Sequence, residues 1–389
     1  MKYVIFSHSG WSSFPYRRYI ESLPERERTL FFGNLSNEDQ QIYGLQSLSL
    51  PEIDRLEKGE YTAIVASPYL LPLVFQIEPR NIIALLDFVP DNEDSSLWQK
   101  FSGLLAAQAQ LIGSRNEEIY LEQCICHENV VLLQNENKEC ETIWAEVISA
   151  IDQSESLDPW KRSQWESRVA FYKGLHDQIG DHEKVCYSLA SYLYFLERSM
   201  AKQYLTASFE QMILKNNRDC LSTYYRFFSA IEAKAGNLDL AVRNYAITAI
   251  TEEEKLNVKS FYSLLEEGRK DLVQAGIFKL NKDYLSAIRV LMASNDPEAN
   301  RYLLPNYLNT YRWEEALNLL KKMELPVTEQ YFVDGIRGIL QRIRGKRHEG
   351  IHLLLRASVH DWKVLSSIAE IDQWEQAMKK TIRRLNDVK

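Results

Sequence analysis

Short apolar runs of strand length recur through the first 133 residues, separated by turn residues or by helix-like stretches. Runs of this length without polar alternation are typical of strands buried on both faces of a sheet. Helix-like stretches between them include 51–58, which begins with a proline at a permitted first-turn position, and 95–109. Strands that alternate with helices predict an α/β domain with a mostly parallel sheet covered on both faces. The predicted strands are 3–6, 29–32, 45–50, 62–66, 81–86, 110–112 and 130–133.

The pattern changes after residue 152. A helix predicted over 139–151 closes a Rossmann-like unit, and from Asp158 onward apolar residues recur every three or four positions, as on one face of a helix. Seven of the eleven prolines lie at or before Pro90, so the turns that separate short strands and helices concentrate in the first part. The sequence predicts a Rossmann-like domain over 1–152 and an all-α domain over 153–389.

The helices of the second part repeat. Segment 225–245 is similar to a tetratricopeptide repeat, with a small residue on the first helix, a glycine turn, and a small residue and an aromatic on the second. Small residues recur at the matching position after 46, 29 and 34 residues, which predicts a degenerate tetratricopeptide-like α-solenoid with one lengthened and one shortened unit. Small residues let paired helices approach closely. The expected packing residues are Gly236, Ala241, Tyr245, Ala287, Ala316 and Gly350.

Composition narrows the function classes. The formal net charge of −8 over 389 residues argues against a nucleic-acid binder, because phosphate contacts need an excess of Lys and Arg. Five unevenly spaced cysteines do not make a disulfide scaffold, so a reducing compartment is expected. The first residues lack the apolar core of a secretory signal, and no apolar run reaches the ~18 residues of a membrane helix. We expect a cytoplasmic protein with no nucleic-acid partner.

Six segments of the first part follow one another in a distinctive order: 6–11, 16–18, 64–68, 84–88, 109–114 and 129–135. The first is a predicted strand that runs into a Trp-containing loop, the second begins an Arg-bearing helix, and the other four are predicted strands with their exit loops. In this order they resemble the acceptor-side domain of GT-B glycosyltransferases that build bacterial surface polysaccharides, of the teichuronic-acid type. The resemblance implies a Rossmann-like fold and a glycosyl-transfer setting.

Two departures from that family change the expected function. In the family, a turn containing glycine leads to a second Rossmann-like domain, which holds most of the nucleotide sugar. Segment 134–138 of this chain lacks that glycine, and predicted helical repeats replace the second domain. Ser9-Gly10 is also too short to cradle a pyrophosphate as a glycine-rich loop does. We therefore expect no cofactor and no complete intramolecular glycosyl transfer.

Residues at the carboxyl ends of the predicted strands would line any cleft that remains. His8 and Asp87 are the candidates for catalytic groups, His8 as a general base. The other cleft candidates are Trp11, Arg17, Ser67 and Ser114. The structural alternative makes Ser67 and Ser114 helix caps, Asp87 a turn cap, and Trp11 a core residue.

Two motifs have metal-ligand spacing. Residues 348–352 read His-Glu-Gly-Ile-His, the zincin signature in which His348 and His352 would bind zinc one helical turn apart. The alternative, which we favour, makes Gly350 the small residue of a repeat helix. Cys124-Ile125-Cys126-His127 offers three ligands, with Cys140 the nearest fourth, and we favour a loop with reduced thiols. We expect no metal.

The C-terminal end is basic. The last 55 residues carry twelve Lys or Arg against six Asp or Glu, so this end is about +6 and the remainder about −14. A basic face here would suit an acidic partner segment, with an anionic membrane surface less favoured; the alternative is a solvated face on the terminal repeats. The candidate residues are Arg337, Arg342, Arg344, Lys346 and Arg347.

Two functions remain. The first is a non-catalytic protein-binding scaffold that acts with a glycosyltransferase in surface polysaccharide or protein glycosylation, its helical groove holding a partner segment. The second is an active or partner-dependent glycosyltransferase whose repeats present the acceptor. Aromatic residues at helical spacing fit a groove or, alternatively, a core. They are Tyr224, Tyr225, Tyr307 and Tyr311.

Overall fold

The computed structural model describes most of the chain. Its described residues are 2–11, 14–23, 29–86, 95–133, 138–153, 155–196, 198–323, 330–344, 346–358, 373 and 376–383. They form two compact units. The first unit contains residues 1–123, 129–157 and 310–389, and the second contains 124–128 and 158–309.

The first unit is built on a seven-stranded parallel sheet with strand order β3-β2-β1-β4-β5-β6-β7. Four consecutive residues of β1, Tyr3 to Phe6, have no exposed surface, as expected for a central strand covered on both faces. The strands are β1 (Lys2–Gly10), β2 (Thr29–Asn34), β3 (Gln46–Ser47), β4 (Tyr61–Val65), β5 (Asn81–Leu85), β6 (Leu111–Ser114) and β7 (Val130–Leu132).

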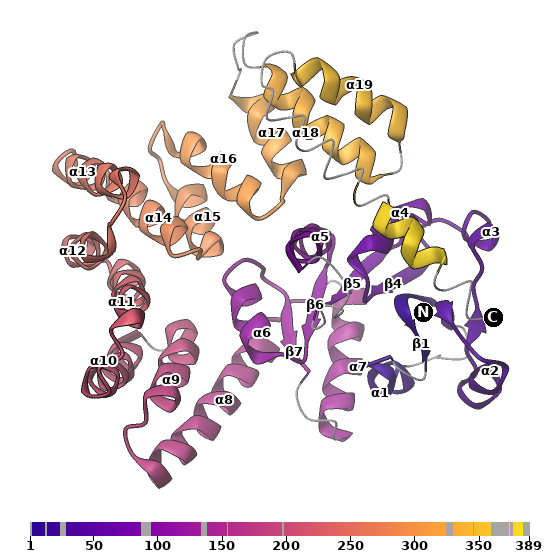
Figure 1. Cartoon of the computed structure of the whole chain (residues 1–389), viewed down its shortest axis with the longest axis horizontal. Helices are drawn as coiled ribbons and strands as arrows, with labels where there is room; N and C mark the ends of the chain where they lie inside the picture. The colour runs from indigo at the N-terminus through magenta and orange to yellow at the C-terminus, as the bar shows by residue number, and fades with distance from the viewer. Residues whose placement is uncertain are drawn as a thin grey trace. The chain divides into compact units, whose positions relative to one another are not determined.

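Helices lie on both sides of this sheet, with α5 on one side and α7 on the other (Figure 1). Helix α1 packs beside α7, where the rings of Tyr19 and Trp144 meet edge to face at 6.2 Å. The α/β architecture predicted from the sequence is confirmed. The helices are α1 (Arg17–Glu21), α2 (Asn37–Tyr43), α3 (Leu50–Ile53), the 3₁₀ helix η3 (Pro68–Leu70), α4 (Leu71–Gln76), α5 (Ser95–Gln108), α6 (Glu117–Cys124) and α7 (Lys138–Asp152).

The second unit consists of helices packed in antiparallel pairs, which confirms the predicted all-α region. Adjacent helices of a pair contact each other, as in α11 with α12 and α14 with α15, and α11 also contacts α14 of the next pair. The helices are α8 (Asp158–Ile179), α9 (Glu183–Leu196), α10 (Arg198–Leu214), the 3₁₀ helix η4 (Arg218–Cys220), α11 (Leu221–Ala235), α12 (Leu238–Thr248), α13 (Glu252–Glu266), α14 (Lys270–Leu280), α15 (Tyr284–Ala293) and α16 (Ala299–Asn309).

Helix α13 accounts for the longest repeat interval. It lies between the pair α11–α12 and the pair α14–α15, so the 46 residues from Ala241 to Ala287 contain one additional helix. Thr251 starts it with a capping box, in which the Thr251 hydroxyl accepts from the Glu254 amide and the Glu254 carboxylate accepts from the Thr251 amide. Phe261 of α13 packs over Gly276 of α14, where a Cβ would lie 2.5 Å from the ring.

Helices α17 (Trp313–Lys322), α18 (Gln330–Ile343) and α19 (Arg347–Ser358) belong to the first unit by their contacts. The Tyr311 ring, just before α17, covers Gly103 of α5 so closely that a Cβ there would lie 2.5 Å from it. The domain boundary expected between residues 152 and 153 stays a prediction. Among the described residues, no helix has the length and apolar content needed to cross a bilayer.

Candidate functional sites

The carboxyl edge of the sheet at β1 and β4 is filled by aromatic side chains. In this strand order, the chain continues from β1 toward β2 on one side and from β4 toward β5 on the other. Open α/β sheets form their ligand crevice at such a point, beyond the carboxyl ends of the two strands. The His8 ring lies edge-on to Trp98 at 5.5 Å, and Trp98 lies edge-on to Tyr69 at 5.2 Å. Trp98 and Tyr69 are buried, so large side chains occupy part of the expected crevice.

Ser67 follows β4 at this edge. It occupies the N-cap position of η3, but its side chain makes no capping hydrogen bond. Its hydroxyl is buried and has no hydrogen-bond partner among the residues that the structure describes. Ser114, at the end of β6, instead donates to the Asn116 carbonyl at 3.0 Å and accepts from the Asn116 amide.

Asn116 caps α6, a role that we did not assign from the sequence. Its side-chain oxygen accepts from the amides of Glu118 and Ile119 at 2.9 and 3.2 Å. The signal was present, since Asn stands directly before a helix whose first turn holds two acidic residues.

Trp11 and Arg17 belong to a different cluster from His8. Trp11 is buried, stacked on Phe14 at 5.8 Å and edge-on to Phe31 at 5.5 Å. The Arg17 guanidinium pairs with Glu21 at 3.2 Å and lies 5.1 Å from the Tyr43 ring centroid. Asp87 lies outside the described residues. The described candidates therefore separate into a His8 group, a Trp11–Arg17 group and Ser114.

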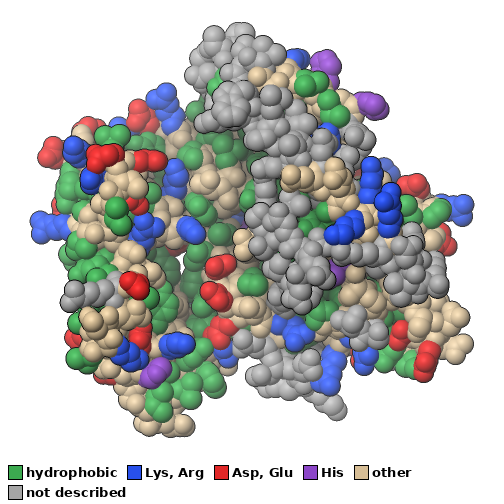
Figure 2. All heavy atoms as spheres, viewed as in Figure 1, with side chains coloured by type: hydrophobic (Ala, Val, Ile, Leu, Met, Phe, Trp, Pro, Cys, Tyr) green, Lys and Arg blue, Asp and Glu red, His purple; other side chains and the backbone are tan. Residues whose placement is uncertain are grey.

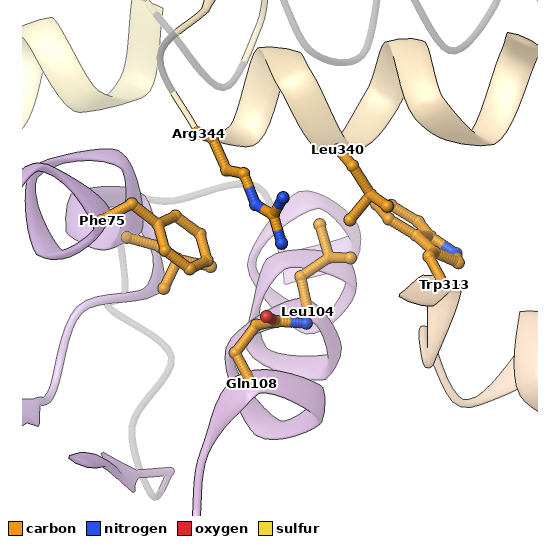
Figure 3. A pocket seen from close by; sticks show the side chains of 7 residues that line it. Phe75, Leu104, Gln108, Trp313, Leu340 and Arg344 are labelled. Atoms are coloured by element: carbon orange, nitrogen blue, oxygen red, sulfur yellow. The ribbon is translucent and has the colours of Figure 1, made fainter. Parts of the chain in front are cut away.

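A pocket lies in the first unit where α4 and α5 meet α17 and α18 (Figure 3). It holds about 240 Å³ of empty space, part of it open to solvent, and the Arg344 guanidinium points into it above Leu104 and Gln108. The part of it that the centre of a water molecule can occupy is about 10 Å³, room for roughly one water. We interpret it as a packing gap. Its lining residues are Leu71, Phe75, Leu104, Gln108, Trp313, Leu340 and Arg344.

The zincin-like motif lies on α19. His348 and His352 are exposed, and the Glu349 carboxylate accepts from the Gln341 amide at 3.1 Å. Gly350 faces Gly338 of α18, so that a Cβ on Gly350 would lie 2.8 Å from the Gly338 carbonyl oxygen. The absence of side chains at both positions brings the two helices together.

The basic residues of this region have different environments. Arg337 and Lys346 are exposed, whereas Arg342 is only 3% exposed and lies against Gly350. Arg344 pairs with Glu314 of α17. The side chain of Arg347 lies outside the description. Arg342 thus contributes to the α18–α19 contact rather than to an exposed face.

The repeat residues of the second unit pack as small and aromatic core groups. Ala241, Ala287 and Tyr245 are buried, and the Ser229 hydroxyl of α11 donates to the Ala241 carbonyl at 2.8 Å, joining α11 to α12. Gly236 ends α11 in the left-handed conformation with φ of 83°. Ala316 is likewise buried, in the first unit. Of the aromatic groove candidates, Tyr224 and Tyr307 are buried, and Tyr225 and Tyr311 are half-buried.

A polar network joins helices inside the second unit. The buried Glu232 carboxylate pairs with Lys202 and accepts from the side-chain amide of Asn237 at 2.8 Å. The Tyr194 hydroxyl donates to Asp283 at 2.6 Å, and Asp283 also caps α15. Buried polar groups with partners of this kind fix one arrangement of the helices.

The Cys124–Glu128 segment is anchored to the second unit. The Leu285 amide donates to the Ile125 carbonyl at 2.9 Å, and the Lys161 ammonium donates to the Glu128 carbonyl. Cys124 is buried and Cys126 is half-buried. The side chain of Cys140, the fourth metal ligand considered for this loop, is outside the described part.

Exposed large apolar side chains concentrate on the second unit. Ten of the thirteen in the described chain belong to it. Figure 2 shows hydrophobic side chains at the surface over its helices, on the left of the view. These ten are Phe171, Ile179, Ile213, Leu214, Leu240, Ile247, Ile250, Leu256, Tyr262 and Met292.

The comparisons with known proteins were negative: no family model, no curated protein and no solved structure matches this chain.

Proposed function

We propose that this chain is a non-catalytic scaffold whose helical unit binds an amphipathic helix of a partner protein. The observation that carries the proposal is the concentration of exposed large apolar side chains on that unit. Contiguous exposed apolar surface is uncommon on monomeric soluble proteins and marks interaction surfaces.

The apolar patch that we assign to the partner consists of Leu240, Ile247, Ile250 and Leu256. Leu240 and Ile247 are seven residues apart and share one face of α12, Ile250 lies in the connection, and Leu256 is on α13, which packs against α12. Ile250 is 79% exposed and Leu256 66%, so burial of both would release substantial apolar surface from water.

Neighbouring charge indicates the chemistry of the partner. The first turn of α13, which precedes Leu256, carries Glu252, Glu253 and Glu254. Glu252 pairs with Lys255 and Glu254 with Arg226, and Glu253 is exposed. A partner helix with apolar residues at i, i+3 or i+4 and i+7, flanked by Lys or Arg, would complement both features.

The class of partner follows from the resemblance of the first part to GT-B glycosyltransferases. We propose that the scaffold acts with a glycosyltransferase in surface polysaccharide or protein glycosylation, in a cytoplasmic setting. The alternative, an active or partner-dependent glycosyltransferase, requires a nucleotide sugar at the carboxyl edge of the sheet, where His8, Trp98 and Tyr69 pack. A thermal-shift screen separates the two, since a ligand at a hundred times its Kd stabilises the chain by about 2.7 kcal/mol.

The interaction is tested by placing a photo-crosslinking amino acid at Leu256 in the native host, with Ile42 of α2, also exposed and apolar, as the matched control position. We expect Leu256 to crosslink one heterologous protein that Ile42 does not. A crosslink to a second copy of this chain, or the same products from both positions, would contradict the proposal.

A further inference from the structure

The turn between α8 and α9 brings together an imidazole, a carboxylate and a thiol. The His176 Nε2 atom lies 2.8 Å from Asp181 Oδ1, and the Cys186 Sγ atom lies 3.9 Å from the same oxygen. All three ligand atoms lie within 4.8 Å of one another. The residues follow each other at intervals of five, so the sequence shows no helical i, i+4 motif.

Backbone hydrogen bonds fix this turn. Gly180 ends α8 with φ of 71°, and its amide donates to the His176 carbonyl at 2.7 Å. The Cys186 amide donates to the His182 carbonyl at 2.9 Å, which starts α9. The cluster thus rests on two helix ends joined by a short, ordered connection.

The cluster does not suit cysteine catalysis. The Cys186 thiol donates to Asp181 Oδ1, at 3.9 Å, and the His176 imidazole contacts that same oxygen, so the acceptor of the thiol proton is a carboxylate and not the imidazole. Two effects raise the pKa of the Cys186 thiol to about 11: its burial, which is the larger, and the nearby charge of Asp181. At neutral pH the thiol is protonated and a poor nucleophile.

We propose that His176, Asp181 and Cys186 form a zinc-binding site. Nitrogen, oxygen and sulfur ligands are those that Zn²⁺ takes, with water able to complete a four-coordinate site. Bond lengths of about 2.0–2.3 Å place tetrahedral ligand atoms roughly 3.3–3.7 Å apart, so only small side-chain adjustments are needed.

The surroundings of the three ligands support this assignment. Cys186 is fully buried, His176 is one-quarter exposed, and Asp181 is 55% exposed, which gives an ion a path from solvent. The Tyr204 ring lies edge-on to His176 at 5.5 Å and restricts its rotation. The other ring nitrogen of His176, Nδ1, lies 3.9 Å from an Asp177 carboxylate oxygen. In metal-bound histidines the ring nitrogen that does not bind the metal commonly contacts a carboxylate in this way.

The test is a titration of the reduced, chelator-treated full chain with Zn²⁺ by calorimetry, and with Co²⁺ by absorption. We expect one Zn²⁺ per chain with release of about one thiol proton, and a thiolate-to-cobalt charge-transfer band. Cys186→Ala should abolish the band, and Asp181→Asn, at an exposed position that tolerates substitution, should weaken affinity at least about 10-fold.

Two matched controls locate the ion. Cys220→Ala removes a free thiol elsewhere in the unit, and the double variant His348→Gln/His352→Gln removes the zincin-like pair. Both should bind Zn²⁺ as the wild type does. Binding weaker than about 10 µM, binding that survives Cys186→Ala, or binding lost only in the His348/His352 variant would overturn the proposal.

Discussion

At the scale of single residues, the α18–α19 contact depends on glycine. Gly350 approaches the Gly338 backbone, so a side chain there meets main-chain atoms that cannot rotate away. We expect Gly350→Val to lower the free energy of unfolding by about 1–3 kcal/mol. Chemical denaturation measures this loss.

Gly174, in the interior of α8, is the matched control because a Cβ there meets nothing within 4 Å. Gly174→Ala should stabilise the chain by about 0.5–1 kcal/mol through helix propensity. Equal effects of the two substitutions would show that the α18–α19 approach is not tight.

The sequence predicted some residue roles and not others. Gly236 and Ala241 were readable because a left-handed turn and a close helix approach restrict the residue type. The His176, Asp181 and Cys186 cluster was not, because its members meet only once the α8–α9 turn has folded. Likewise, the burial of Arg342 depends on contacts with α19 that periodicity does not report.

At the scale of elements, Arg269 joins two helix connections. Its guanidinium donates to both oxygens of Asp296 at 2.8 Å and to Glu298 at 2.8 Å, linking the start of α14 to the start of α16. The hydrogen bonds from Arg269 lower the pKa of Asp296 to about 2.

This pair predicts a specific pH dependence. A carboxyl whose pKa is lower in the folded state contributes stability above its unfolded pKa of about 3.9, and that stability is lost as the pH falls toward 2. We expect the Tm difference between wild type and Arg269→Met to be constant from pH 7 to 5 and to shrink between pH 4 and 2. A difference that does not change with pH would show that the pair contributes no charge-dependent stability.

The element pattern was largely readable from the sequence. Apolar runs predicted the central strands because both of their faces are buried, and the irregular repeat interval predicted a lengthened unit. The strand predicted over 45–50 is reduced to the two exposed residues of β3, and its last residue, Leu50, starts α3. The sequence did not reveal that the additional length is the helix α13. The capping box at Thr251 indicates that a helix starts there, but it does not indicate between which helix pairs that helix lies.

At the scale of the whole molecule, the C-terminal helices α17–α19 belong to the same unit as the sheet. Leu340 of α18 is 6% exposed and, like Leu104 of α5, lines the pocket of the first unit. We expect Leu340→Asp to destabilise this unit by about 3 kcal/mol or more, because it replaces a buried apolar side chain with a carboxylate that is removed from water. Hydrogen exchange followed by mass spectrometry resolves the two units.

Faster exchange should be confined to the sheet strands and to α17–α19 in that variant, with α8–α16 unchanged. Leu355→Asp, at a position 51% exposed on α19, is the matched control and should leave exchange as in the wild type. Equal acceleration in both units would mean that they unfold together.

The most direct test of the scaffold proposal is the affinity for the crosslinked partner, measured by calorimetry with purified proteins. Ile247→Glu/Leu256→Glu should weaken binding at least about 10-fold, which is 1.4 kcal/mol, while Ile42→Glu in the first unit should bind as the wild type does. Unchanged affinity in the patch variant, or equal losses in both variants, would contradict the assignment of α12 and α13 as the binding surface.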